Sequence, residues 1–248
     1  MVSFLLALQF LTILPIRVKE ASAKKIGGSM IYFPFIGLLL GLSLWGINKG
    51  LLSLNFSLSA VNTILVVFLL VLTGGLHLDG LADTADAFLS GKPKEEMLAI
   101  MRDSHVGVMG VLSLLGIILL KIGLLSSVGA SLKAIALLLM CVLSRWSVVL
   151  AMFFFPYARQ NGKAKSFIQG LNLRIFCLSS IVVIFCAFAI WQIKGLILLL
   201  AIAAFAYLSA KLVSRKISGI TGDTLGATIE LAEVIVLFGL CILEKIHF

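Results

Sequence analysis

The sequence predicts an all-α integral membrane protein, a polytopic bundle of about seven spanning helices preceded by a short apolar segment. Hydrophobic residues make up 61% of the 248 positions and charged residues only 12%, whereas a soluble domain is nearer one half and one quarter. The apolar runs are rich in Leu, Ile, Val and Phe and do not alternate strictly, which favours helices over a β-barrel. We treat residues 1–248 as one membrane domain.

The apolar runs of spanning length define the expected helices in order along the chain. They cover residues 29–51, 57–76, 107–127, 133–155, 175–193, 195–213 and 228–246. Residues 2–16 are apolar but short and end near Pro15, so they could cross the membrane, re-enter it or lie in its interface. We do not expect residues 1–16 to be a cleaved signal, because neither a basic start nor a small-residue cleavage motif accompanies them.

Basic residues predict the orientation of the bundle. Segments 17–28, 77–106, 156–174 and 211–227 hold 14 of the 20 Lys and Arg residues and alternate with nearly uncharged connections. By the positive-inside rule these segments face the cytoplasm, so we expect a multi-pass protein of the cytoplasmic (inner) membrane. The net charge of +9 then reflects topology and not nucleic-acid binding. Ten of the eleven acidic residues lie in or beside the same segments, which predicts an active site on the cytoplasmic face.

The first polar motif is TGGLHLDGLADTADAF, residues 73–88. On a helix, Asp79, Asp83 and Asp86 would fall within about 60° of one another. Such a stripe repels itself at a membrane edge, and a bound cation would remove the repulsion. Oxygen ligands without a Cys/His set favour Mg²⁺ or Mn²⁺ over Zn²⁺. A solvated helix start is the alternative, but capping and the helix dipole account for only one or two of the three carboxylates.

The second motif is MRDSHVG, residues 101–107. Arg102 and His105 could contact phosphate, and Asp103 could join a metal site or orient Arg102. An ordinary interfacial cap with a snorkelling arginine explains the same residues equally well.

The third motif is SGITGDTLGATIELAE, residues 218–233. Thr221, Asp223 and Thr224 offer oxygens at a glycine-rich helix start, where a phosphate and a bridging cation could bind. Glu230 and Glu233 lie on the same helical face as Asp223. For Glu233, an interhelical pair is a strong alternative.

Two arginines outside the motifs complete the candidates. Arg145 lies near the middle of an apolar run, where a lone charge is costly, so it should face the interior and pair with an acid or a substrate phosphate. Arg159, in FFFPYARQNGKAK, could line a substrate entrance together with Tyr157.

Acid clusters and arginines on one membrane face, without a nucleophilic triad, favour metal-assisted phosphoryl transfer. The predicted roles fall into three groups. The predicted metal ligands are Asp79, Asp83, Asp86, Asp103, Asp223 and Glu230. The predicted catalytic residues are Asp83, Asp86, Arg102 and His77. The predicted substrate-binding residues are Arg102, His105, Arg145, Arg159, Thr221 and Thr224.

The motifs resemble those of the cobalamin synthase family, the adenosylcobinamide-GDP ribazoletransferases. The resemblance extends from FLLALQFLTILPI at the start through HLDGLAD and MRDSHVGVMG to GITGDTLGATIELAE. It implies that adenosylcobinamide-GDP reacts with α-ribazole or its 5′-phosphate, with Mg²⁺ required, to give adenosylcobalamin or its 5′-phosphate and GMP. Ala87, His105 and Ser218 depart from the family pattern, and none of them removes an acid.

Two other functions compete with this interpretation. One is a phosphotransferase that acts on CDP-alcohols, because DGLAD is similar to the DGxxAR motif of those enzymes. The other is a cation-coupled transporter, which would also use acids within the membrane. The expected partners are the two substrates and the lipid bilayer, without nucleic acid; a homo-oligomer is left open.

Overall fold

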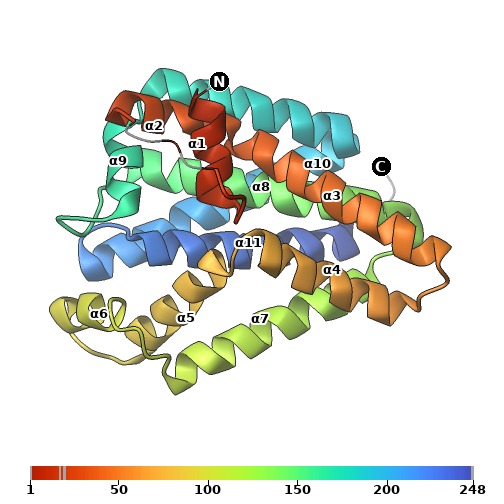
Figure 1. Ribbon diagram of the computed structural model, residues 1–248, viewed down its shortest axis with the longest axis horizontal. Coiled ribbons are helices and arrows are strands. Elements are labelled where there is room, and N and C mark those ends of the chain that lie inside the picture. The colour runs from red at the N-terminus through yellow and green to blue at the C-terminus, as the bar shows by residue number, and fades with distance from the viewer. Residues whose placement is uncertain (1, 17, 19–20, 247–248) are drawn as a thin grey trace.

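The structure is a computed structural model that describes residues 2–16, 18 and 21–246, and within these residues it is helical (Figure 1). The α-helices in order are α1 Val2–Leu11, α2 Ala23–Ser29, α3 Phe33–Ser53, α4 Leu58–Leu72, α5 Leu76–Leu89, α6 Lys94–Ile100, α7 Val108–Ser127, α8 Lys133–Phe154, α9 Lys163–Gly170, α10 Leu173–Ile217 and α11 Gly222–Leu243. Short 3₁₀ turns, η1 Met30–Tyr32 and η2 Ala130–Leu132, precede α3 and α8. The predicted all-α class is confirmed.

Five helical segments of the described chain are long and apolar enough to cross a membrane, or six if the bent pair α4 and α5 counts as one span. Helix α10, with 45 residues, consists of two helices joined at a kink, where Trp191 and Gln192 have non-helical backbone angles. The chain doubles back there, because the backbone of Gly195 lies against the carbonyl of Ala187. When the two halves of α10 are counted separately, the structure contains the seven apolar segments that the sequence predicts.

Helix α8 occupies the centre of the bundle and packs against α3, α10 and α11 (Figure 1). Every residue from Leu139 to Met152 is buried. This stretch is apolar on nearly all sides, which is the pattern of a helix surrounded by other helices. The short helix α1 packs on α2 and α3. At 10 residues it is about 15 Å long, too short to span the membrane.

The turn between α4 and α5 directs the first acidic motif. The two helix axes meet at 89°, and the turn contains Gly74 and Gly75, with φ of 63° and 68°. Two successive residues in the left-handed region are accessible to glycine at little cost, which explains the GG pair. We take the membrane span to end at this turn, so that α5 carries its aspartates beyond the apolar segment.

Candidate active site

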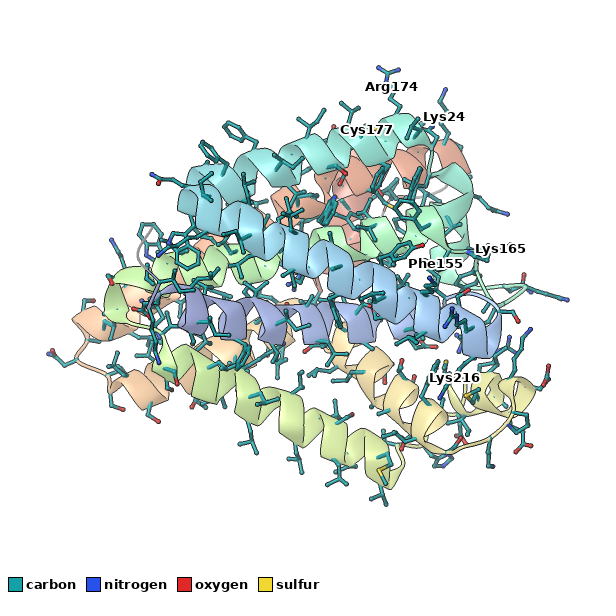
Figure 2. All side chains as sticks on the ribbon, turned by 180° about the vertical axis from the view of Figure 1, so that it is seen from behind. Lys24, Phe155, Lys165, Arg174, Cys177 and Lys216 are labelled. Carbon is teal, nitrogen blue, oxygen red and sulfur yellow. The ribbon has the colours of Figure 1, made fainter. Side chains whose placement is uncertain are left out.

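A backbone contact joins two polar segments at one end of the bundle. Residues 156–158, which follow α8, run parallel to residues 219–221, which precede α11. The amide of Ala158 donates to the Ile220 carbonyl at 2.9 Å, and the amide of Ile220 donates to the Pro156 carbonyl at 2.8 Å. The basic ends of several helices lie at this same end, where Lys165 and Lys216 project in Figure 2.

This contact places Arg159 beside Asp223, although the two belong to different sequence motifs. Arg159 Nη2 lies 2.6 Å from Asp223 Oδ2 and 3.4 Å from the carbonyl of Met101. Their side chains are 10% and 21% exposed, so the pair is largely shielded from bulk solvent. The residue predicted to bind substrate and the residue predicted to bind metal therefore form an ion pair in this structure.

Thr221 and Thr224 form a reciprocal cap at the start of α11. The Thr224 amide donates to Thr221 Oγ1 at 3.2 Å, and the Thr221 amide donates to Thr224 Oγ1 at 2.9 Å. Such a cap satisfies backbone amides that a helix start leaves open. Thr221 Oγ1 also lies 3.4 Å from Asp223 Oδ2. Both threonines are buried, and the Thr221 hydroxyl helps to position the Asp223 carboxylate in the first turn.

A close approach between α5 and α11 brings the first and third motifs together. A Cβ atom on Gly80 would lie 2.7 Å from the carbonyl oxygen of Asp223, so this position requires glycine. Asp79 and Asp83 flank Gly80 along α5 and face Asp223 across the contact. Burial, followed by repulsion from Asp79 and Asp223, raises the pKa of Asp83 to about 7. Three carboxylates thus share a small region with the Arg159 guanidinium.

A cavity of about 250 Å³ lies at this contact and is called the acidic cavity below. Its polar lining consists of His77, Asp79, Tyr157, Arg159 and Asp223. Asp83 lies one turn beyond Asp79, outside this lining. Within the described structure, His77 Nδ1 is buried without a hydrogen-bond partner and Tyr157 has a pKa raised by burial. The polar groups therefore face a space from which most water is excluded.

Asp86, the third acid of the stripe, holds the start of α7. Its two carboxylate oxygens accept hydrogen bonds from the amides of Gly107 and Gly110, at 2.7 and 2.8 Å. An acid in this place satisfies open amides and also complements the helix dipole. Asp86 therefore fixes the loop after α6 against α5, and its predicted roles as metal ligand and catalytic residue stay predictions.

The MRDSHVG motif lies outside the lining of the acidic cavity. Asp103 Oδ1 lies 2.6 Å from His105 Nδ1, with side chains that are 58% and 89% exposed. This hydrogen bond raises the pKa of His105 and lowers that of Asp103. Arg102 is also exposed. The predicted roles of Arg102, Asp103 and His105 in binding phosphate or metal stay predictions.

Glu230 belongs to a second polar cluster, buried deeper between α7, α8 and α11, which we call the buried ion cluster. Lys121 Nζ lies 2.6 Å from Glu230 Oε2 and also contacts Glu233, which in turn pairs with Arg145. Arg145 donates further to Ser144 Oγ at 2.8 Å. Arg145 thus pairs with an acid, as one of its two predicted alternatives stated, and Glu233 forms the expected interhelical pair.

Lys121 was not among the residues predicted from the sequence to have a role in the site. The structure buries this lysine inside α7, with 1% of its side chain exposed. Its position six residues before the end of an apolar run was the available signal, because a lysine so placed needs an acidic partner.

Among the described residues, no group of three or more His, Cys, Asp and Glu side chains is arranged to hold a metal ion by itself. Asp79 and Asp83 nevertheless fit a hard cation that takes few protein ligands. Both offer carboxylate oxygens, and the pKa of Asp83 is raised first by burial and then by repulsion from Asp79 and Asp223, which Arg159 only partly offsets. Mg²⁺ is commonly bound by one or two carboxylates, with water and substrate phosphates completing its shell.

The fold and the cavity define the class: a multi-pass helical membrane protein with an acid-lined cavity at its basic end. Residues 3–241 match the CobS family, described as cobalamin-5-phosphate synthase, and the chain belongs to this family.

Curated relatives match almost end to end and carry the name adenosylcobinamide-GDP ribazoletransferase. The protein from Desulforamulus reducens is 34% identical over 99% of this chain and 98% of its own length. The protein from Caldanaerobacter subterraneus subsp. tengcongensis is 39% identical, with coverage of 94% and 95%. The protein from Desulfitobacterium hafniense is 35% identical, with coverage of 94% for both. No solved structure matches the chain.

Proposed function

We propose that the chain joins adenosylcobinamide-GDP to α-ribazole, or to α-ribazole 5′-phosphate, and releases GMP. Family membership and the names of the relatives point to this reaction. The structural observation that carries the proposal is the contact at Gly80, where Asp79 of α5 lines one cavity together with Asp223 and Arg159. Carboxylates together with one arginine suit a diphosphate better than they suit an uncharged substrate.

The reaction breaks a phosphoanhydride bond and forms a phosphoester bond. A ribose hydroxyl of the acceptor attacks the phosphorus attached to cobinamide, the bond to the bridging oxygen breaks, and GMP leaves. Arg159 pairs with Asp223 when the diphosphate is absent and can turn its guanidinium to the phosphate oxygens when it is present. A guanidinium that does so stabilises charge that develops on the transferred group.

Asp83 is a candidate both for a metal ligand beside Asp79 and for the base that takes the proton of the attacking hydroxyl. Its pKa near 7 allows it to exchange a proton at neutral pH, which is the condition for an efficient general base. Asp79, on the cavity wall, is then the first metal ligand. Mg²⁺, when bound, would neutralise the diphosphate and polarise the phosphorus. His77, which also lines this cavity, is a further candidate to hydrogen-bond the substrate.

The positive-inside rule, applied to the basic loops, supports a cytoplasmic position for this end of the protein. Single cysteines introduced at Lys92 and Lys216, both exposed at this end, should react with membrane-impermeant maleimide only after the cells are opened. A cysteine at Asn55, in the exposed turn between α3 and α4, is the matched control and should react in intact cells. Labelling of position 92 or 216 in intact cells would reverse the orientation.

The function is tested by GMP release from purified protein in detergent or vesicles. Adenosylcobinamide-GDP and α-ribazole together should yield GMP, and each alone should not. Chelation with EDTA should stop the release, and added Mg²⁺ should restore it. CMP release from a CDP-alcohol, with none of the expected GMP, would instead favour the phosphotransferase alternative.

A further inference from the structure

A second cavity adjoins the acidic cavity and has a different chemical character. It measures about 360 Å³, lies between α1, α2, α9 and the start of α5, and is called the aromatic cavity below. Apolar side chains dominate its wall, with Gln9 and Ser166 as polar groups. Phe10 and Leu76 line both cavities, so the two spaces are neighbours across these two side chains.

The aromatic wall is part of a packed cluster. The rings of Phe10 and Phe167 have centroids 4.3 Å apart, and Phe33 lies behind them at 5.8 and 5.9 Å. Phe33 is fully buried, which limits how far the other two rings can move. Backbone contact between Gly27 of α2 and Gly170 of α9 holds α9, and with it Phe167, against the N-terminal helices. Phe10 is half-buried and keeps part of its ring at the cavity, whereas Phe167 is only 6% exposed and holds the Phe10 ring in place.

The lining chemistry selects among the parts of the two substrates. The described lining of the aromatic cavity offers apolar side chains and two neutral polar groups, which suit a heteroaromatic base. Ring faces bind flat heteroaromatic bases by stacking. The cavity volume suits a bicyclic base and is small for a corrin macrocycle. A benzimidazole presents mainly apolar edges, whereas guanine has several polar groups that need partners.

We propose that the aromatic cavity binds the heteroaromatic base of the acceptor nucleoside. The ribose of that nucleoside then passes Phe10 and Leu76 and brings its hydroxyl to the acidic cavity, where the diphosphate of the other substrate lies. Gln9 adds a carboxamide beside the base; its Oε1 accepts a hydrogen bond from the Val18 amide at 3.4 Å. This inference rests on the proposed function and assigns the acceptor to a place within it.

The test is steady-state kinetics of GMP release by Phe167→Leu. Loss of the ring that holds Phe10 in place should raise the KM for α-ribazole about tenfold. The KM for adenosylcobinamide-GDP should stay within about twofold, because that substrate does not bind in the aromatic cavity. Phe176→Leu is the matched control, since Phe176 pairs with Phe153 at the same centroid distance of 4.3 Å, away from both cavities. It should leave both KM values unchanged.

A labelling measurement does not depend on turnover of the variant. A cysteine introduced by Ser166→Cys, in a chain whose exposed Cys177 is replaced by Ser, should react with maleimide. Saturating α-ribazole should slow this labelling at least about fivefold, whereas GMP should not. Protection by GMP, or a rise in the KM for adenosylcobinamide-GDP alone, would place the guanine there and overturn the proposal.

The proposed function and this inference fail in different ways. If the wild-type chain releases no GMP, the proposed reaction is wrong. If the wild-type chain releases GMP while Phe167→Leu leaves the KM for α-ribazole unchanged and α-ribazole gives no protection, the reaction stands and the aromatic cavity is not the acceptor subsite.

Discussion

Two clusters of acids lie along the same helix, α11, and differ in how their charge is balanced. At the start of α11, Asp223 shares its surroundings with Asp79 and Asp83, and Arg159 is the described cation that contacts it. Two turns further on, the buried ion cluster joins two glutamates to one lysine and one arginine. The first cluster carries excess negative charge beside a cavity, whereas the second is electrically neutral and closed.

This difference separates a binding site from a structural contact. Buried charges persist in a membrane protein when they are paired, and the pairs of the buried ion cluster tie α7, α8 and α11 together. Unbalanced carboxylates at a cavity store repulsion that a cation or a cationic group of the ligand can relieve. The predictions below separate the two roles by stability and by activity.

The largest expected effect is on stability, from Glu233→Gln in the buried ion cluster. Glu233 contacts both Arg145 and Lys121, so its neutralisation leaves two buried cations to share Glu230. Breaking a buried pair in this way costs about 3–5 kcal/mol. Denaturant unfolding in detergent should report a loss of this size, and Asp79→Asn should not. An unchanged denaturant midpoint for Glu233→Gln would show that the buried ion cluster does not stabilise the fold.

The next largest effect is on activity, from Asp83→Asn. GMP release should fall at least about 100-fold, which is the scale of losing one major interaction in the transition state. The unfolding free energy should be unchanged or higher, because one of several repelling carboxylates is neutralised. Added Mg²⁺ should recover part of the activity if Asp83 acts as a ligand and none if it acts as the base. Near-normal turnover would remove Asp83 from the site.

The affinity for Mg²⁺ should depend on pH. Because the pKa of Asp83 is raised to about 7, this carboxyl is mostly protonated at pH 6 and mostly ionised at pH 8. The metal requires the ionised form, so binding displaces a proton and the Kd should rise about tenfold for each pH unit below 7. Calorimetric titration at pH 6 and pH 8 measures this slope. Asp83→Asn should flatten it, and a slope that persists in this variant would assign the proton to another group.

The smallest effect is expected from the paired change Lys121→Met with Glu230→Met. This removes one positive and one negative charge and leaves Arg145 paired with Glu233. Replacing a buried ion pair by apolar side chains is often neutral or stabilising, so the unfolding free energy should fall by no more than about 1 kcal/mol. GMP release should stay within about threefold of wild type. A loss comparable to that of Asp83→Asn would return Glu230 to the catalytic site.

Much of the fold follows from local sequence patterns. The apolar runs are long enough to predict each spanning segment, including the two halves of α10 that meet at Trp191 and Gln192. The 89° turn at Gly74 and Gly75 was not predicted, although the GG pair marked the place. A glycine pair indicates where a chain can turn, but the direction of the turn is set by packing against other helices.

The sequence indicated which residue types make up the site, but only part of their arrangement in space. The spacing of Asp79 and Asp83 follows from helix geometry, and Asp79 and Asp223 are both near enough to Asp83 to raise its pKa by repulsion. The ion pair of Asp223 with Arg159 depends on a backbone contact between residues far apart in the chain. The hydrogen bonds that Asp86 accepts from amides at the start of α7 likewise join residues far apart in the chain. A single sequence carries no signal for such long-range partners.

The most direct test compares Mn²⁺ binding in three purified proteins, with electron paramagnetic resonance to report free Mn²⁺. Wild type and the paired variant Lys121→Met with Glu230→Met should bind Mn²⁺ with the same Kd, because the buried ion cluster takes no part in binding. Asp83→Asn should raise the Kd at least about tenfold, since one carboxylate of the unbalanced cluster is lost. Unchanged binding in Asp83→Asn together with lost binding in the paired variant would contradict the account and place the metal in the buried ion cluster.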